Sequence, residues 1–341
     1  MTPGATPRQL GFRMPAEWEP HEATWIAWPH HREDWPGRFA PIPWVYTEIV
    51  RKLSLVERVR ILVDTASTEK VARRMLAKAG AQMPAVEFYH FQTDRAWIRD
   101  YGPVFLKNES GDRATVHWRF NGWAKYPNYQ FDQAIPLKIA ERFALPHWSP
   151  DVVMEGGALD VNGRGLLLAT EECLLSPIQA RNPRLSVDEV ERALCDYLGV
   201  ERVLWLRNGI VGDDTHGHID DLARFVDPDT VVIATEDDPA DPNHSILNEN
   251  ESILARYPVR SVRLPMPEPL FFNGQRLPAS YANFYIANRM VLVPTYNDPH
   301  DRLALNILAD LFDDREIVGV NCTELVWGLG ALHCITQQQP A

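Results

Sequence analysis

The sequence predicts a mixed α/β fold, because short apolar runs typical of buried strands alternate with segments of helical periodicity. Of the 341 residues, 45% are hydrophobic and 23% are charged, which is enough apolar material for a large core. Proline is frequent but scattered, and no low-complexity linker divides the chain. We therefore expect one domain over residues 1–341, in which strand–helix–strand units recur.

The first half of the chain contains two predicted helices and three predicted strands. A helix is expected over residues 44–57, followed by a buried strand at 60–64 and a second helix that ends near Lys78. The apolar runs 152–154 and 165–169 are predicted to be strands joined by the Asn- and Gly-containing turn at 160–165.

The next predicted helix begins at a clear capping signal. Ser186 and Glu189 have the spacing of a capping box, and Val190, Leu194 and Leu198 then fall on one helical face. Strands are predicted at 203–206 and 230–234, and a further helix at about 243–257.

The last predicted elements are a hairpin and a helix. The runs 284–287 and 290–293 flank Asn288-Arg289, and Asp298-Pro299 is a helix start. This helix is expected to turn five apolar residues towards the core: Leu303, Ile307, Leu308, Leu311 and Phe312. Such alternation is by default typical of a doubly wound sheet, although a propeller of mixed α/β blades would give the same periodicity.

Charge and cysteine usage exclude several classes of protein. The chain carries 34 basic and 46 acidic residues, a net charge of −12, and its Lys and Arg form no run longer than two, so no nucleic-acid partner is expected. No apolar run approaches the ~20 residues of a bilayer span, and residues 1–9 lack the apolar stretch of a signal peptide. Four widely spaced cysteines without a CxxC pair predict a reduced, cytoplasmic protein.

Cys334 is the candidate nucleophile. A lone cysteine is usually a small buried hydrophobe, but Gly328 and Gly330 would let the backbone pass close to a ligand, and a polar tail follows. A reactive thiol needs nearby positive charge. If the segment is a strand, the adjacent His333 points to the opposite face, so the imidazole is expected from elsewhere. Cys173 and Cys195 lie in apolar patterns and are predicted to be structural.

The segment His216-Gly-His218-Ile-Asp220-Asp221 is the expected source of that imidazole. In an extended segment, His218 and Asp220 share a face and could reach one site together. The pattern HxHxD also resembles a string of metal ligands. No HExxH motif or second histidine pair accompanies it, so a metal site is the less favoured interpretation.

Two further acidic residues complete the candidate site. Glu155 follows an apolar run and precedes two glycines, which favours an inward turn over a solvated rim position. Asp100 lies in Trp97-Ile-Arg-Asp-Tyr-Gly-Pro, where the alternative is a surface ion pair with Arg99. Together a thiol, an imidazole and several carboxylates suit hydrolysis at a guanidinium carbon. Paired carboxylates bind that planar cation, a thiolate adds to it, and an imidazole protonates the departing ammonia.

These motifs, in this order, resemble the agmatine deiminase family of the guanidine-modifying pentein superfamily, which is close to the bacterial peptidylarginine deiminases. The resemblance runs nearly end to end. It rests on residues 14–21, 24–29, 97–103, 120–125, 155–157, 218–220, 283–288 and 333–338. The chain departs from the family pattern at Gly328-Leu-Gly-Ala-Leu and in lacking a paired glycine after Trp123.

The resemblance implies a fold, a set of roles and an assembly. The implied fold is a five-bladed α/β propeller of pseudo-fivefold ββαβ units, with no metal, no organic cofactor and a homodimeric assembly. Cys334 would be the nucleophile and His218 the general acid and then base. Asp100 and Asp220 would grip the guanidinium, and Glu155 would bind it and help to orient the imidazole.

The implied substrate is a small cationic guanidino compound. Trp97 would pack against its aliphatic chain, with a plain core position as the alternative. The implied reaction converts agmatine to N-carbamoylputrescine and ammonia, on a route to putrescine. The alternatives are a deiminase of peptidylarginine or another guanidino compound and a non-catalytic polyamine-binding protein. A Cys-His amidase fits less well, because an oxyanion site needs donors. Asp213 and Asp214 are both candidates for the distal ammonium.

Overall fold

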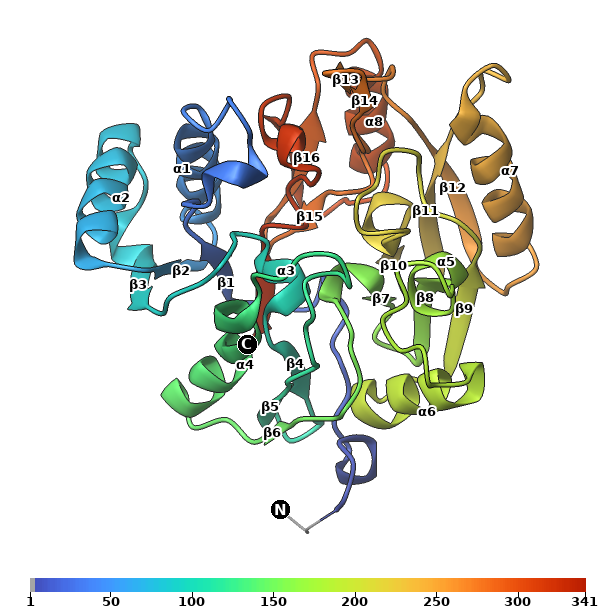
Figure 1. The fold of residues 1–341 in the computed structure, drawn as a ribbon, viewed down its shortest axis with the longest axis horizontal. Coiled ribbons are helices and arrows are strands. Elements are labelled where there is room, and N and C mark those ends of the chain that lie inside the picture. The colour runs from blue at the N-terminus through green and yellow to red at the C-terminus, as the bar shows by residue number, and fades with distance from the viewer. Residues whose placement is uncertain (1–3) are drawn as a thin grey trace.

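The strands form six small sheets (Figure 1) in the computed structural model, which describes residues 4–341. Residues 1–3, at the start of the stretch examined for a signal peptide, lie outside that range. Five of the sheets share one plan, in which an antiparallel pair is followed, after a helix, by a strand parallel to the second. Over residues 4–341 there is thus no single doubly wound sheet, and that default expectation is wrong.

The first sheet pairs the first described strand with the last. The strand order is β18-β1-β2-β3, with β18 antiparallel to β1 and the other neighbours parallel. Its elements are β1 (His21–Ala27), α1 (Ile42–Leu53), β2 (Arg58–Val63), α2 (Ala66–Ala79), β3 (Val86–His90) and β18 (Gln337–Pro340).

The other four similar sheets follow one another along the chain. Their strands are β4 (Val104–Lys107), β5 (Arg113–Val116) and β6 (His147–Trp148); β7 (Asp160–Val161), β8 (Leu166–Thr170) and β9 (Arg202–Leu206); β10 (Ala223–Asp227), β11 (Thr230–Thr235) and β12 (Arg260–Pro265); and β15 (Tyr285–Ile286), β16 (Met290–Thr295) and β17 (Glu316–Asn321). The connecting helices are α4 (Gln130–Arg142), α6 (Val187–Leu198), α7 (Pro242–Leu254) and α8 (His300–Ala309). The two-stranded hairpin β13 (Phe271–Phe272) and β14 (Gln275–Arg276) is the sixth sheet.

Most predicted elements are confirmed. The expected helices correspond to α1, α2, α6, α7 and α8, and the capping box of Ser186 and Glu189 is formed at the start of α6. The hairpin around residues 288–289 is the pair β15–β16.

Two expectations are wrong for reasons of tertiary packing. Residues 152–154 are buried but form only an isolated bridge, between Val153 and Arg119, and the antiparallel partner of β8 is β7. Leu303 is 48% exposed, because α8 buries a narrower stripe that includes Ala304 and Leu308.

Short helical turns carry the polar residues singled out in the sequence. Helix α3 (Ile98–Tyr101) packs against the 3₁₀ helix η4 (Gly156–Ala158), which packs in turn against η5 (Ile219–Asp221). The 3₁₀ helix η6 (Leu325–Gly328) precedes the turn that leads into β18. Between residues 4 and 341, no helix has both the length and the apolar character needed to cross a membrane.

Candidate active site

A cavity of about 740 Å³ opens beside the segments that were singled out in the sequence. Cys334 contributes to its wall together with three buried charged residues, Asp34, Arg95 and Asp100. Much of the remaining wall is aromatic, formed by Trp97, Trp123, Tyr126, Phe272 and Trp327. The cavity therefore offers apolar walls around a thiol and a carboxylate, as a ligand with a charged head and an aliphatic body requires.

Cys334 lies in the turn 332–335, not in a strand. The expectation that His333 faces away from the site assumed a strand, and it is wrong for this reason. The Cys334 Sγ atom accepts a hydrogen bond from Asn283 Nδ2 at 3.2 Å and lies 3.8 Å from Asp220 Oδ2. Burial, followed by the charges of Asp220, Asp221 and Asp100, raises the pKa of the Cys334 thiol well above its ordinary value.

The glycines before Cys334 are required by close packing against tryptophan. A Cβ atom added at Gly330 would lie 2.7 Å from the Trp97 ring, and one at Gly328 would lie 2.5 Å from Trp35 Nε1. The backbone can therefore pass beside the wall of the cavity only without side chains at these positions.

Asp100 is held by donors that leave room for a ligand. Its Oδ1 accepts a hydrogen bond from Gly157 N at 3.0 Å, and its Oδ2 accepts one from Trp123 Nε1 at 2.9 Å. Each oxygen retains a further lone pair. Burial, opposed by His218 and reinforced by Asp220 and Glu155, raises the pKa of Asp100 to about 6. Asp100 is buried, and Arg99 instead donates to Gln338, so the surface ion pair considered for Arg99 and Asp100 is not formed.

Glu155 caps η4 and is completely buried. Arg181 Nε donates to both of its oxygens, at 3.1 and 3.2 Å. Burial works against ionisation of Glu155, but Arg181 and then His218 bring its pKa below the ordinary value. The charge of Glu155 is thus already paired. No pattern in the sequence pointed to Arg181, because its contact with Glu155 is made only by the tertiary fold.

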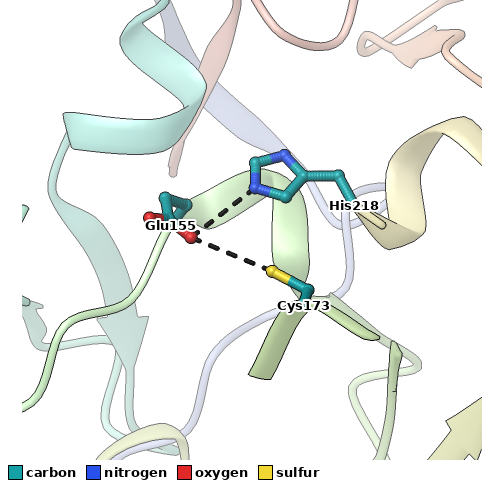
Figure 2. Close-up of side chains that lie close together, drawn as sticks. All are labelled: Glu155, Cys173 and His218. Atoms are coloured by element: carbon teal, nitrogen blue, oxygen red, sulfur yellow. Dashed lines mark hydrogen bonds and ion pairs between the residues drawn. The ribbon is translucent and has the colours of Figure 1, made fainter. Parts of the chain in front are cut away.

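His218 is surrounded by carboxylates that it does not hydrogen-bond. Its Nε2 lies 3.6 Å from Glu155 Oε2 (Figure 2), and its Nδ1 lies 3.6 Å from Asp100 Oδ1 and 4.0 Å from Asp220 Oδ1. Burial lowers the pKa of His218, but Asp100, Cys173 and Glu155 outweigh it and bring the pKa well above the ordinary value. Within the described part of the chain, both ring nitrogens lack a hydrogen-bond partner, so the imidazole can exchange protons with a bound ligand.

The segment around His218 is not extended, which corrects the expected geometry. His218 caps η5, and its backbone N–H donates to Asp213 Oδ2 at 3.0 Å. His216 diverges from the site, with Nδ1 3.7 Å from Glu172 Oε1. The HxHxD string therefore does not converge on one point as a set of metal ligands would.

Asp220 is fixed through one oxygen. His333 Nδ1 lies 2.6 Å from Asp220 Oδ2, and His333 Nε2 lies 2.8 Å from Glu17 Oε2. Over residues 4–341, Asp220 Oδ1 is buried without a hydrogen-bond partner. Burial opposes ionisation, but His333 and then His218 bring the pKa of Asp220 below its ordinary value. Sequence reasoning missed the roles of His333 and Glu17, although both lie in motifs that carry the family resemblance.

A second thiol, that of Cys173, lies close to His218. Cys173 is 1% exposed, does not contribute to the cavity wall, and has its Sγ 4.0 Å from Glu155 Oε2 (Figure 2). The potential ligand atoms of Glu155, Cys173 and His218 lie within 4.8 Å of one another, as do those of Asp220, Asp221 and Cys334.

Neither of these two groups is suited to a cation as it stands. The guanidinium of Arg181 donates to Glu155 in the first group, and the amide of Asn283 donates to Asp221 and Cys334 in the second. A metal ion would have to displace both donors.

A thiol, an imidazole and acidic side chains gathered at one cavity are the components of a thiol-dependent enzyme. Comparison with known proteins gives the family. The chain belongs to the Porphyromonas-type peptidyl-arginine deiminase family, which it matches over residues 13–340. The resemblance seen in the motifs is therefore confirmed at the level of the family.

Individual relatives match over nearly their whole length. The agmatine deiminase of Pseudomonas aeruginosa (strain LESB58) is 36% identical over 370 residues, an alignment that covers 99% of this chain and 98% of the relative. The structure of the agmatine deiminase of Enterococcus faecalis superposes with a TM-score of 0.92 at 35% identity, covering 99% of this chain and 98% of that one. A substrate-bound cysteine-to-serine variant of the C. jejuni agmatine deiminase has a TM-score of 0.90 at 29% identity, with 97% and 96% covered.

Proposed function

We propose that this protein hydrolyses agmatine to N-carbamoylputrescine and ammonia through a covalent intermediate on Cys334. One observation carries the proposal: Asp220 Oδ1 is a buried carboxylate oxygen without a hydrogen-bond partner in the described chain, beside Cys334 and Asp100. An unsatisfied buried anion is costly, and a guanidinium would supply the missing donors. The named relatives are agmatine deiminases, which supports agmatine as the source of that guanidinium.

Binding of the cation would prepare the nucleophile. In the empty site, burial and the carboxylates favour the neutral thiol of Cys334. A guanidinium held by Asp100 and Asp220 offsets those negative charges, and the thiol then releases its proton to solvent. The thiolate forms beside the carbon that it attacks.

The two halves of the reaction would share one imidazole. The thiolate forms a bond to the guanidinium carbon, and His218, protonated beforehand, gives its proton to the departing nitrogen, which leaves as ammonia. Neutral His218 next takes a proton from water, and the hydroxyl oxygen bonds to the same carbon. Collapse of this adduct breaks the carbon–sulfur bond and returns the thiolate, and the hydroxyl group releases its proton to solvent as the carbonyl of the product forms. In this scheme Glu155, whose charge Arg181 already pairs, mainly orients the imidazole.

The far end of the substrate would lie among aromatic side chains. Trp97 contributes to the cavity wall, and its Nε1 donates to Asp34 Oδ2 at 3.2 Å, which fixes the indole. Of the two aspartates considered for the distal ammonium, Asp214 lines the cavity, whereas Asp213 accepts the backbone N–H groups of Gly217 and His218. The Asp214 carboxylate already pairs with Lys125 Nζ and accepts from the hydroxyl of Tyr126, so neither aspartate is assigned to the ammonium.

The proposal extends to architecture and setting. The five sheets of shared plan support a five-bladed α/β propeller within one domain over residues 1–341. Four free cysteines, one of them the nucleophile, support a reducing cytoplasmic setting. The protein would act as a homodimer on a small guanidino cation, without metal, organic cofactor, nucleic acid or membrane, in putrescine biosynthesis.

The test is ammonia release from agmatine, free arginine and a blocked peptidylarginine, measured side by side with Cys334→Ala as the control. Turnover of agmatine alone, lost in the variant, is the expected result. Preference for the peptide substrate would instead identify the protein as a peptidyl-arginine deiminase, the activity that the family description names. Binding of agmatine without turnover in the unmodified protein would favour the polyamine-binding alternative.

A further inference from the structure

Asn283 lies at the centre of the site but has no part in the scheme above. It is completely buried in the segment that precedes β15. Its Nδ2 donates to Cys334 Sγ at 3.2 Å and to Asp221 Oδ1 at 2.9 Å. Its Oδ1 accepts a hydrogen bond from the backbone N–H of His333 at 2.9 Å. One amide group thus contacts the reacting sulfur and the backbone of the preceding residue.

The network allows only one orientation of this amide. Rotation by 180° would bring Oδ1 against the sulfur and the Asp221 carboxyl and would bring the NH₂ group against the N–H of His333. The contact with His333 would be repulsive, because the NH₂ group and the backbone N–H are both donors. Both N–H bonds of Asn283 are therefore directed at Asp221 and at the sulfur, and the amide is held there before a ligand arrives.

The other groups around the sulfur oppose a negative charge on it. Asp220, Asp221 and Asp100 are the acidic groups that face Cys334, and the phenol of Tyr46 is coupled to it more weakly. The nearby imidazoles are directed elsewhere, with His333 bound between Asp220 and Glu17 and His218 next to Asp100 and Glu155. The backbone of Ala331 acts in the opposite sense and lowers the pKa of the thiol. A further donor at the sulfur therefore has a large electrostatic effect in this site.

We propose that Asn283 is a catalytic residue, whose side-chain amide donates a hydrogen bond to the sulfur of Cys334 and stabilises its thiolate form. The same bond acts twice, when the thiolate attacks the carbon and when it leaves at the end of the reaction. Asn283 transfers no proton, because both N–H bonds stay intact throughout. The assignment rests on the proposed function only in naming the reaction that the thiolate serves.

Asp221 is the positioning partner in this arrangement. Burial, followed by the charges of Asp220 and Asp213, raises the pKa of Asp221 well above its ordinary value, which favours the neutral carboxyl in the empty site. The carboxyl can accept the second N–H of Asn283 whether it is neutral or ionised, and in either form it fixes the amide.

The experiment measures the thiolate directly. Alkylation of Cys334 by iodoacetamide, a neutral reagent, is followed by mass spectrometry of the peptide that contains it, because the thiolate is the reactive form. The scan runs from about pH 7 to 12, since the pKa of the thiol is already raised well above its ordinary value. Asn283→Ala removes the donor, and Asn283→Asp replaces it with an acceptor of the same shape. Asn162→Ala is the matched control, since Asn162 is also buried and bonds the backbone of Pro228 and Arg164 far from the cavity wall.

Loss of a hydrogen bond to a charged sulfur is expected to lower the alkylation rate at neutral pH by about ten- to a hundredfold. The midpoint of the pH profile should rise by about one to two pH units, with Asn283→Asp shifted further than Asn283→Ala. The value of kcat for agmatine should fall with it, and KM should change little. Unchanged alkylation midpoints in folded variants would overturn the proposal.

The two proposals can fail separately. Alkylation needs no substrate, so a shifted midpoint in a protein that does not turn over agmatine would refute only the proposed function. If Asn283→Ala does not fold, Asn283→Asp keeps the side-chain volume and supplies the same measurement. Equal loss of reactivity in Asn162→Ala would identify a general effect of buried asparagines and would also overturn the inference.

Discussion

Two buried thiols, Cys173 and Cys334, lie near the acidic residues of the site, and their nearest neighbours differ in charge. Cys173 lies beside Glu155 and His218, with Arg181 nearby, a grouping that looks like a Cys-His-acid triad. Cys334 lies among carboxylates that raise its pKa. By local composition alone, Cys173 would be the better nucleophile.

Access to the cavity reverses that ranking. Cys334 contributes to the cavity wall, whereas Cys173 is buried and does not. The carboxylates that disfavour the Cys334 thiolate in the empty site are also the groups that would bind a guanidinium. A poor environment for an unassisted thiolate is therefore a suitable one when the substrate supplies the positive charge.

The largest expected difference is in ammonia release between the Cys334→Ala and Cys173→Ala variants. Cys334→Ala is expected to lower ammonia release from agmatine by at least about a thousandfold, because the covalent route is lost, while agmatine still binds. Cys173→Ala should lower it by less than about tenfold, mainly by leaving a small void next to His218. Ammonia release and isothermal titration calorimetry on both variants check this. The opposite ranking would make Cys173 the nucleophile.

The next largest effect is expected from substitution of His218. His218→Ala is expected to lower kcat by about 100- to 10,000-fold, the usual contribution of general acid–base catalysis. The fold should largely persist, because neither ring nitrogen makes a hydrogen bond in the described chain. Circular dichroism and thermal unfolding provide the control. An unfolded variant would show that His218 is structural.

The acid limb in the pH profile of kcat/KM is expected to come from Asp100, beside Cys334, and not from Glu155, beside Cys173. Asp100 has a pKa of about 6 and must be ionised to hold a guanidinium, so kcat/KM should fall about tenfold per pH unit below that value. Glu155, on the Cys173 side, has a lowered pKa and keeps its charge there. Because the folded-state pKa of Asp100 is raised, its protonation also favours folding at low pH, and this contribution is lost as the pH rises through about 6.

The pH dependence of kcat/KM for agmatine, measured between about pH 4.5 and 8, checks this assignment. Asp100→Asn should remove the acid limb together with most of the activity. An acid limb that persists unchanged in that variant would assign the titration to another group.

The smallest expected effect is that of chelation. Preincubation with EDTA or 1,10-phenanthroline should leave ammonia release unchanged, because Arg181 and Asn283 already occupy the acceptor atoms of the two candidate ligand groups. Inactivation that zinc reverses would contradict this and revive the metal interpretation of the histidine segment.

Sequence periodicity predicted local elements well and long-range pairing poorly. The capping box at Ser186 and the apolar face of α6 depend only on neighbours within a few residues, and both are confirmed. Residues 152–154 have the composition of a strand, but burial there comes from packing without a full partner strand. Division of the strands into six sheets likewise depends on contacts that no short window contains.

At the candidate site, too, local motifs could be predicted from the sequence and long-range contacts could not. Motif reasoning selected Cys334, His218, Asp100 and other acidic residues, and the structure places Cys334 and Asp100 in the wall of one cavity, with Asp220 beside Cys334 and His218 beside both aspartates. Motif reasoning did not reveal Arg181 or Glu17, whose partners Glu155 and His333 are 26 and 316 residues away in the sequence. The orientation of His333 was misjudged because a strand was assumed where the chain makes a turn.

The pairing of β18 with β1 determines when the site can form during biosynthesis. Strand β1 leaves the ribosome long before its antiparallel partner β18, which starts at residue 337. At about 5–20 residues per second, on the order of tens of seconds pass between them. Throughout that interval one edge of β1 is open to other chains, and the nucleophile has not yet been made. The step that closes this edge also delivers Cys334 to the cavity, so the nascent protein protects its sheet and gains its reactive thiol in a single event.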